Sequence, residues 1–316
     1  MKKNLWRIGL IALLAVRGGT LPRPSFSQVS KGGSLEYQVS VTAISIAVAV
    51  QDKGGRYIDN LTRKDFAVFE NNVPQTISYF QHDDAAPVSL TVLLDVSGSM
   101  ALDNKLADSK IALRELVTHM LRPQDEVSLL IFAEGEVEVA ARFSKDKMNF
   151  LVELEKVEPY GKTALNDAVA VSPEFANRGN NQKRLLLLIT DGIENDSQLK
   201  LDQTLEIARR VDVPIQAVGY KIPLSDLYLE KYKRAADLTP FGITETLERF
   251  SAATGGKAFF VNQPEELTAA LRDIHRDLSQ QYIIGYTSHQ RTSDEYRKIL
   301  VVTPKKKYRV RTRAGY

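Results

Sequence analysis

Cysteine is absent from this chain of 316 residues. A disulfide framework is therefore excluded, and so is the lipid-modified cysteine of a lipoprotein. The net charge is only +3, which at this length gives no indication of nucleic acid or another polyanionic partner. The histidines, His82, His119, His275 and His289, are scattered without the spacing of metal ligands. The composition is that of a globular protein large enough to bury a substantial core.

A long hydrophobic run is also missing. The apolar stretch over residues 8–16 is too short to span a bilayer as a helix, and basic residues precede it. This pattern predicts a signal peptide over residues 1–27, with Gln28 as the new N-terminus, although an ordinary N-terminal helix would also fit. We therefore expect an exported protein, periplasmic or secreted, with no stable membrane span after cleavage.

The spacing of apolar residues changes twice along the rest of the chain. Residues 37–81 alternate with period two, which predicts a small β-rich, Ig-like unit over residues 28–86. Residues 87–281 alternate strand-like apolar runs with helical patterns, which predicts an α/β domain with a doubly wound, mostly parallel sheet. EVEVAARF follows VSLLIFA after too short a connection for a parallel crossover, so we expect one antiparallel edge strand.

Residues 282–316 predict further strands, which we expect to pack on the α/β domain. In the last of them, KYRVRTR, alternate basic residues form a stripe on one face. Such a stripe could contact an acidic partner. A solvated strand face that resists edge pairing is the interpretation that we favour.

Polar side chains gather where two buried strands end. LTVLLDVSGSM runs from an apolar strand into Asp95, Ser97 and Ser99, and RLLLLITD ends at Asp191. Ligands of open α/β sheets bind outside the carboxyl ends of the strands, where the strand order reverses. If these two strands are neighbours, the two carboxylates converge there, and the loop YGKTALNDA can bring Thr163 to the same place.

This combination resembles the von Willebrand factor A domain and its metal-ion-dependent adhesion site. The resemblance implies that Ser97, Ser99 and Thr163 bind Mg²⁺ directly and that Asp95 and Asp191 act largely through water. The segments DKGGRYIDNLTRKDFAVFENN, SAATGGKAFFV, QYIIGYT and RTRAGY extend the resemblance to exported bacterial proteins of the VWFA-related type. This resemblance predicts the fold of the protein but does not identify its ligand.

Elementary coordination chemistry agrees with a metal site. Mg²⁺ prefers oxygen ligands in near-octahedral geometry, with Mn²⁺ and Ca²⁺ as alternatives here. Hydroxyl ligands are neutral, so they leave the charge of the ion largely uncompensated, and a carboxylate from a partner would complete its shell. Taken singly, a serine pair after a strand is often a helix cap and Asp-Gly is often a turn. The metal site is favoured because the pieces occur together.

Other acidic residues near the strand ends carry weaker hypotheses. Glu194 and Asp196 lie in DGIENDS, close to the predicted metal, and could contribute to ligand binding, although a solvated loop is the more ordinary interpretation. Asp167 could orient the Thr163 loop, or it could simply be an aspartate at the start of a helix, where the helix dipole favours it.

Enzymatic motifs are incomplete. GKT at residues 161–163 would need a glycine where Lys156 stands to form a phosphate loop, and no GxSxG surrounds either serine. A metal-dependent hydrolase would also need a general base, which the sequence does not identify. We expect a non-enzymatic module that binds an exposed carboxylate on a protein or surface ligand. An exported hydrolase and a structural component of an envelope assembly are the alternatives.

Overall fold

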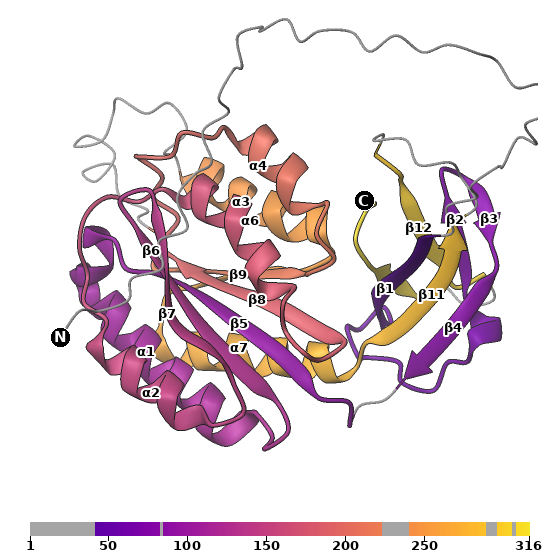
Figure 1. Ribbon diagram of the computed structural model, residues 1–316, viewed down its shortest axis with the longest axis horizontal. Helices are drawn as coiled ribbons and strands as arrows, with labels where there is room; N and C mark the ends of the chain where they lie inside the picture. Colours follow the sequence, from indigo (N-terminus) through magenta and orange to yellow (C-terminus); the bar gives the residue numbers. More distant parts are fainter. Residues whose placement is uncertain (1–41, 83–84, 223–239, 289–295, 305–307) are drawn as a thin grey trace, which may run out of the picture.

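The computed structural model describes residues 42–82, 85–222, 240–288, 296–304 and 308–316. The predicted signal peptide, residues 1–27, lies outside these ranges, so it stays a prediction. Within them, no helix combines the length and the apolar character needed to cross a membrane. The described chain forms a larger α/β unit and a smaller β unit (Figure 1).

A six-stranded sheet forms the centre of the α/β unit, in the order β10-β9-β8-β5-β6-β7. Its strands are β5 (Val88–Asp95), β6 (Glu126–Ala133), β7 (Glu136–Ser144), β8 (Lys183–Thr190), β9 (Ile215–Tyr220) and β10 (Ala258–Val261). Neighbouring strands are parallel except at the edge, where β7 runs antiparallel to β6. The predicted doubly wound fold and its antiparallel edge strand are confirmed.

Helices cover both faces of this sheet (Figure 1). Apolar side chains of α1, α2 and α7 pack on one face, and those of α3, α4 and α6 pack on the other. The helical segments are η2 (Gly98–Asn104), α1 (Lys105–Glu115), η3 (Leu116–Met120), α2 (Lys147–Lys156), α3 (Leu165–Ala176), α4 (Leu201–Ala208), α6 (Pro240–Thr254) and α7 (Pro264–Ser279). Because β5 and β8 lie between two helical layers, nearly all of their side chains are buried, which explains their continuous apolar runs.

The β unit combines both ends of the described chain. One sheet has the order β13-β1-β11-β4, and the other has the order β12-β2-β3. The elements are β1 (Thr42–Gln51), η1 (Arg63–Asp65), β2 (Ala67–Glu70), β3 (Val73–Gln75), β4 (Ile77–His82), β11 (Tyr282–Ser288), β12 (Ile299–Val302) and β13 (Arg309–Arg311). The C-terminal strands thus pair with N-terminal strands, a pairing that the sequence analysis did not predict. Both sheets therefore contain strands from both ends of the described chain.

A buried carboxylate joins the two halves of the β unit. Glu70 is completely buried and accepts hydrogen bonds from the hydroxyls of Tyr286 (2.8 Å), Ser288 (2.7 Å) and Tyr316 (2.9 Å). Arg297 lies 3.5 Å from the same carboxylate. Residues from both ends of the chain therefore satisfy one buried charge, as a shared core requires.

Side chains of the β unit also contact the α/β unit. Asp277 of α7 is buried and accepts hydrogen bonds from Tyr57 (2.6 Å), from Gln216 of β9 (2.9 Å) and from Arg311 of β13. Arg313 is also buried and lies 3.3 Å from Asp212. The prediction of a solvated basic stripe is therefore wrong for Arg311 and Arg313, because both arginines are ion-paired at the junction of the two units.

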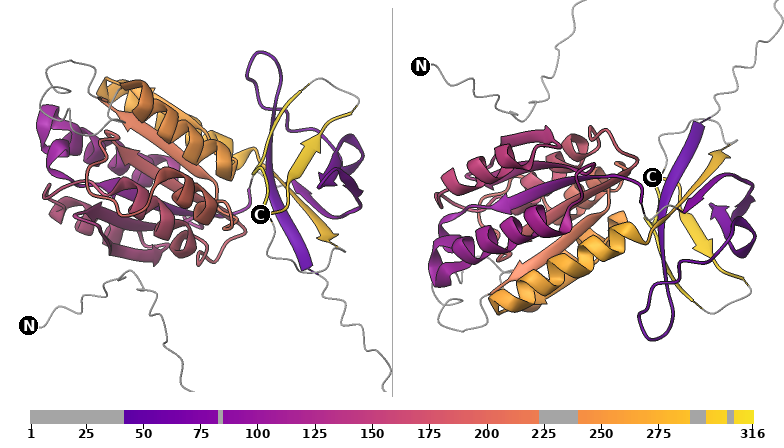
Figure 2. Two further views of the ribbon diagram at one scale, coloured as in Figure 1. Left: turned by 90° about the horizontal axis from the view of Figure 1, so that it is seen from above. Right: turned by 90° about the horizontal axis from the view of Figure 1, so that it is seen from below.

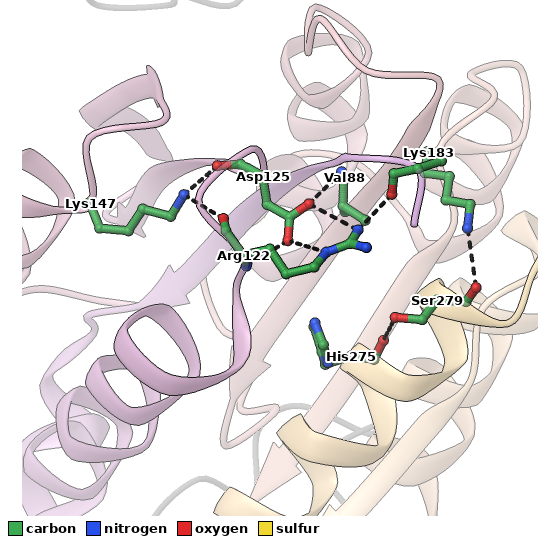
Figure 3. A network of polar contacts seen from close by, with 8 residues as sticks. Val88, Arg122, Asp125, Lys147, Lys183, His275 and Ser279 are labelled. Atoms are coloured by element: carbon green, nitrogen blue, oxygen red, sulfur yellow. Dashed lines mark hydrogen bonds and ion pairs between the residues drawn. The ribbon is translucent and has the colours of Figure 1, made fainter. Parts of the chain in front are cut away.

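The chain enters the α/β unit through a network at the amino edge of the sheet (Figure 3). Asp125 accepts a hydrogen bond from the backbone N–H of Val88 (2.9 Å), and Arg122 bridges Asp125 and the carbonyl of Ala86. Lys183 donates to the carbonyl of Ser279 at the end of α7 (3.1 Å). Since this edge faces the β unit, the carboxyl edge of the sheet points away from it (Figures 1 and 2).

Candidate metal centre

The two predicted aspartates lie at the carboxyl ends of neighbouring strands. β5 pairs with β8 on one side and with β6 on the other, so the strand order reverses at β5. Asp95 ends β5, and Asp191 directly follows β8. Both are completely buried. The structure therefore brings together the two carboxylates that the strand pattern placed at this edge.

Asp95 is held on both of its oxygens. Oδ1 accepts a hydrogen bond from the backbone N–H of Ser97 (2.9 Å), and Oδ2 accepts one from the hydroxyl of Thr190 (2.6 Å). Burial raises the pKa of Asp95 to about 7, and the negative charge of Asp191 adds to this rise. A cation placed beside the two carboxylates would relieve both effects.

The predicted hydroxyl ligands lie on adjoining loops. The hydroxyls of Ser97 and Ser99 are 3.1 Å apart, and Ser97 is buried while Ser99 is half-buried. The backbone N–H of Gly98 donates to the carbonyl of Gly161 (2.9 Å), which joins the serine loop to the loop that carries Thr163. Gly161 has a φ of +67°, and a Cβ there would lie 2.1 Å from a side-chain carbon of Glu134. The positive φ and this close approach both favour glycine at position 161.

Thr163 joins the third loop through its backbone. Its N–H donates to the side chain of Asn195 (2.9 Å), and its carbonyl accepts hydrogen bonds from the N–H groups of Asn195 (3.1 Å) and Asp196 (3.0 Å). Thr163 itself is buried. The loops after β5, before α3 and after β8 thus converge at one place, as predicted.

The acidic residues after Asp191 are engaged within the loop. Glu194 accepts hydrogen bonds from the backbone N–H groups of Asn166 (2.9 Å) and Asp196 (3.0 Å), and from the hydroxyl of Ser197 (2.6 Å). Asp196 forms an ion pair with Lys162 (3.0 Å). These contacts favour a structural role for Glu194 and Asp196, and their contribution to ligand binding stays a hypothesis.

Asp167, in the first turn of α3, also acts on the neighbouring loop. Its two carboxylate oxygens accept hydrogen bonds from the backbone N–H groups of Gln198 and Leu199, both at 2.9 Å. The side chain therefore fixes the segment between β8 and α4, while the contacts of the Thr163 backbone run to Asn195 and Asp196.

Lys105 is the residue that the sequence analysis missed. Its ammonium lies 2.7 Å from Oδ2 of Asp191, and its side chain is 2% exposed. The backbone N–H of Ile193 donates to the other oxygen of Asp191 (3.2 Å). One signal could have revealed Lys105, because it shares the inward face of α1 with Ser109 and Ala112.

The donor set suits a hard divalent cation. All of the candidate side chains offer oxygen, as carboxylate or hydroxyl, which matches the preference of Mg²⁺. With both carboxylates ionised, Asp95, Asp191 and Lys105 leave one buried negative charge without compensation, and burial makes such a charge costly. In the described part of the chain, no three His, Cys, Asp or Glu side chains group as metal ligands. Any metal held here would therefore depend on the hydroxyls as well as the carboxylates.

Comparison with known proteins finds similar chains at low sequence identity. A protein of Borreliella burgdorferi described as uncharacterized is 22% identical over 210 residues, which cover 61% of this chain and 59% of the relative. The alignment thus spans less than two thirds of that protein.

Two solved structures are similar at low sequence identity. The vWF domain of the type V pili tip protein Mfa5 from Porphyromonas gingivalis is 12% identical, with a TM-score of 0.48 over 66% of this chain and 98% of that one. BatB from Bacteroides thetaiotaomicron is 20% identical, with a TM-score of 0.45 over 61% of this chain and 98% of that one.

The family model of the von Willebrand factor type A domain matches residues 90–194, a range that contains Asp95, Thr163 and Asp191. The mostly parallel sheet and the convergent loops at its carboxyl edge agree with this match. Residues 90–194 therefore belong to the von Willebrand factor type A domain family.

Proposed function

We propose that this protein is an exported, non-enzymatic binding module that holds an acidic group of a protein or surface ligand through Mg²⁺. The observation that carries the proposal is the pair of completely buried carboxylates, Asp95 and Asp191, at the ends of neighbouring strands with the Ser97 and Ser99 hydroxyls beside them. A bound cation that offsets the negative charge left by Asp95, Asp191 and Lys105 is the simplest reason to keep two carboxylates there.

The candidate residues would hold the ion in two ways. Ser97, Ser99 and Thr163 would bind it directly through their hydroxyl oxygens. Asp95 and Asp191 would act largely through water and offset part of its positive charge. When bound, the ion would supply a Lewis-acidic position that accepts an external carboxylate.

The surrounding contacts keep the two carboxylates in place. Thr190 and the N–H of Ser97 fix the orientation of Asp95, and the N–H of Ile193 fixes Asp191. The glycine contact between the serine loop and the Thr163 loop keeps the hydroxyls on one edge of the sheet. Export rests on the signal-like residues 1–27.

Calorimetry of the purified protein with Mg²⁺ and Mn²⁺ tests the metal site. The wild type should bind one ion, and saturation at about a hundred times the dissociation constant should stabilise it by about 2.7 kcal/mol. Ser97→Ala and Ser99→Ala should weaken binding. Ser172→Ala removes another buried hydroxyl, which bonds to the carbonyl of Ala168 within α3, and it should bind the ion as the wild type does.

One observation favours a second candidate, a structural module that needs no metal. The ammonium of Lys105 already compensates Asp191. Calorimetry of such a module would detect no binding of Mg²⁺ or Mn²⁺ that depends on the site residues. Its stability would be the same in Mg²⁺ and in EDTA. This result would overturn the proposed function.

A further inference from the structure

A buried lysine side chain lies within the candidate metal centre. Lys105 and Asp191 form an ion pair of 2.7 Å between side chains that are 2% and 0% exposed. Neither group has access to bulk water, so their interaction is screened far less than that of a surface pair. The ammonium is therefore part of the electrostatics of the site.

The start of α1 holds Lys105 in this position. Asp103 and Asn104, directly before it, have left-handed backbone conformations with φ of 51° and 58°, which these residue types tolerate better than most. Lys221, after β9, donates to the carbonyl of Asp103 (2.7 Å) and to the carboxylate of Asp108 (2.8 Å).

A second contact from the end of β9 reaches the same turn. Tyr220 also donates to Asp108 (2.6 Å). The end of β9 thus fixes the first turn of α1. These contacts keep the ammonium of Lys105 next to Asp191.

The charges of the site follow directly. With both carboxylates ionised, Asp95, Asp191 and Lys105 sum to −1, and a divalent ion would bring the site to +1. Without Lys105, the same ion would bring it to zero. A site of charge +1 attracts an anion, whereas its ammonium repels an incoming metal ion. The lysine thus opposes binding of the metal alone and favours the metal together with an anionic ligand.

We propose that Lys105 is a resident counter-ion that weakens binding of the metal alone and strengthens binding of an acidic ligand beside the metal. This inference rests on the proposed function and adds a regulatory property to the same site. Binding couplings are reciprocal, so a carboxylate ligand should raise the affinity for Mg²⁺ by the same factor by which Mg²⁺ raises the affinity for the ligand. The module would hold its ion weakly until an acidic partner arrives.

The test compares Lys105→Met with Lys110→Met by calorimetry with Mg²⁺. Lys110 lies on the same helix, and its ammonium donates to the backbone carbonyl of Glu155 (3.0 Å), outside the site. Lys105→Met should bind Mg²⁺ about tenfold more tightly than the wild type in the absence of a carboxylate, because the repulsion between the ammonium and the ion is removed. Lys110→Met should match the wild type. Acetate, compared with neutral acetamide, should raise the Mg²⁺ affinity of the wild type and have a smaller effect in Lys105→Met.

Stability gives an independent readout. Since Lys105→Met leaves Asp191 buried without its ammonium, the melting temperature in EDTA should fall below that of the wild type, and Mg²⁺ should raise it by more. If Lys105→Met does not fold, Lys105→Gln provides the same comparison, because its amide can donate to Asp191 without carrying charge.

Failure of this inference is distinguishable from failure of the proposed function. A wild type that binds no Mg²⁺ contradicts the proposed function. A wild type that binds Mg²⁺, together with an uncharged Lys105 variant of unchanged Mg²⁺ affinity and unchanged response to acetate, overturns the role of Lys105 alone.

Discussion

The hydroxyl of Thr190 donates a hydrogen bond of 2.6 Å to the carboxylate of Asp95, and both residues are completely buried. The same hydroxyl accepts a hydrogen bond from the backbone N–H of Gly192 (2.9 Å). A single side chain thus links the end of β8, the loop after it and the carboxylate at the end of β5. The candidate metal centre depends on this link for its geometry.

Thr190→Val removes the hydroxyl and keeps the shape of the side chain. We expect it to lower the free energy of unfolding by about 2 kcal/mol, because a buried carboxylate and a buried N–H each lose a partner. Denaturant unfolding in EDTA measures the loss. Thr118→Val is the control, since Thr118 is exposed and its hydroxyl contacts groups close to it in sequence, the carbonyl of Arg114 (2.7 Å) and Nδ1 of His119 (2.9 Å). Equal stability of the two variants would show that the link is unimportant.

Asp277 should couple the two units of the fold. Its carboxylate accepts hydrogen bonds from Tyr57, Gln216 and Arg311 and is almost completely buried. Asp277→Asn removes the charge opposite Arg311, and we expect it to lower the free energy of unfolding by about 3 kcal/mol.

The same change should weaken the junction between the units. Limited proteolysis should therefore cut Asp277→Asn faster than the wild type between the β unit and the α/β unit. Asp273→Asn is the matched control, because Asp273 is an exposed aspartate on the same helix, 3.5 Å from Arg276. Cleavage at the same rate in both variants would indicate that Asp277 does not hold the units together.

His275 should make the protein less stable in mild acid. It lies on α7 beside the network of Arg122 and Asp125 (Figure 3), and burial lowers its pKa below the ordinary value of 6.5. In the unfolded chain the imidazole takes up a proton below about pH 6.5, whereas in the folded protein it stays neutral to lower pH, so acid favours the unfolded chain.

Asp95 contributes with the opposite sign, because its raised pKa favours the folded protein as the pH falls below about 7. The contribution of His275 is therefore measured as a difference from His275→Asn. The stability of the variant relative to the wild type should increase as the pH is lowered from about 7 to about 5. A constant difference across this range would contradict the assignment.

Much of the α/β unit could be predicted because its signals are local. The run before Asp95 and the leucines before Asp191 identify buried strands, and the rule that ligands bind at the carboxyl ends of strands brings the two aspartates together. Lys105 escaped prediction because lysine is usually exposed, and its partner Asp191 lies 86 positions away.

The β unit was harder to predict because its pairing is not local. β1 lies beside β11 and β13, and the periodicity of a strand says nothing of its partner. The sequence pattern of Arg311 and Arg313 therefore predicted a solvated stripe. In the structure they form ion pairs with Asp277 and Asp212 at the junction of the two units. The role of Glu194 depended in the same way on contacts with the start of α3.

The most direct test of the central claim is the binding of a simple carboxylate beside the metal, followed by NMR amide shifts of the loops that contain Ser97 and Asp191. With saturating Mg²⁺, acetate at high concentration should shift these amide signals in the wild type, whereas acetamide should not. In EDTA, neither acetate nor acetamide should shift them. Ser97→Ala and Asp191→Ala should lose the response, and Ser172→Ala should keep it. Shifts that are the same in Mg²⁺ and EDTA, or the same for acetate and acetamide, would contradict a metal-dependent site for acidic ligands.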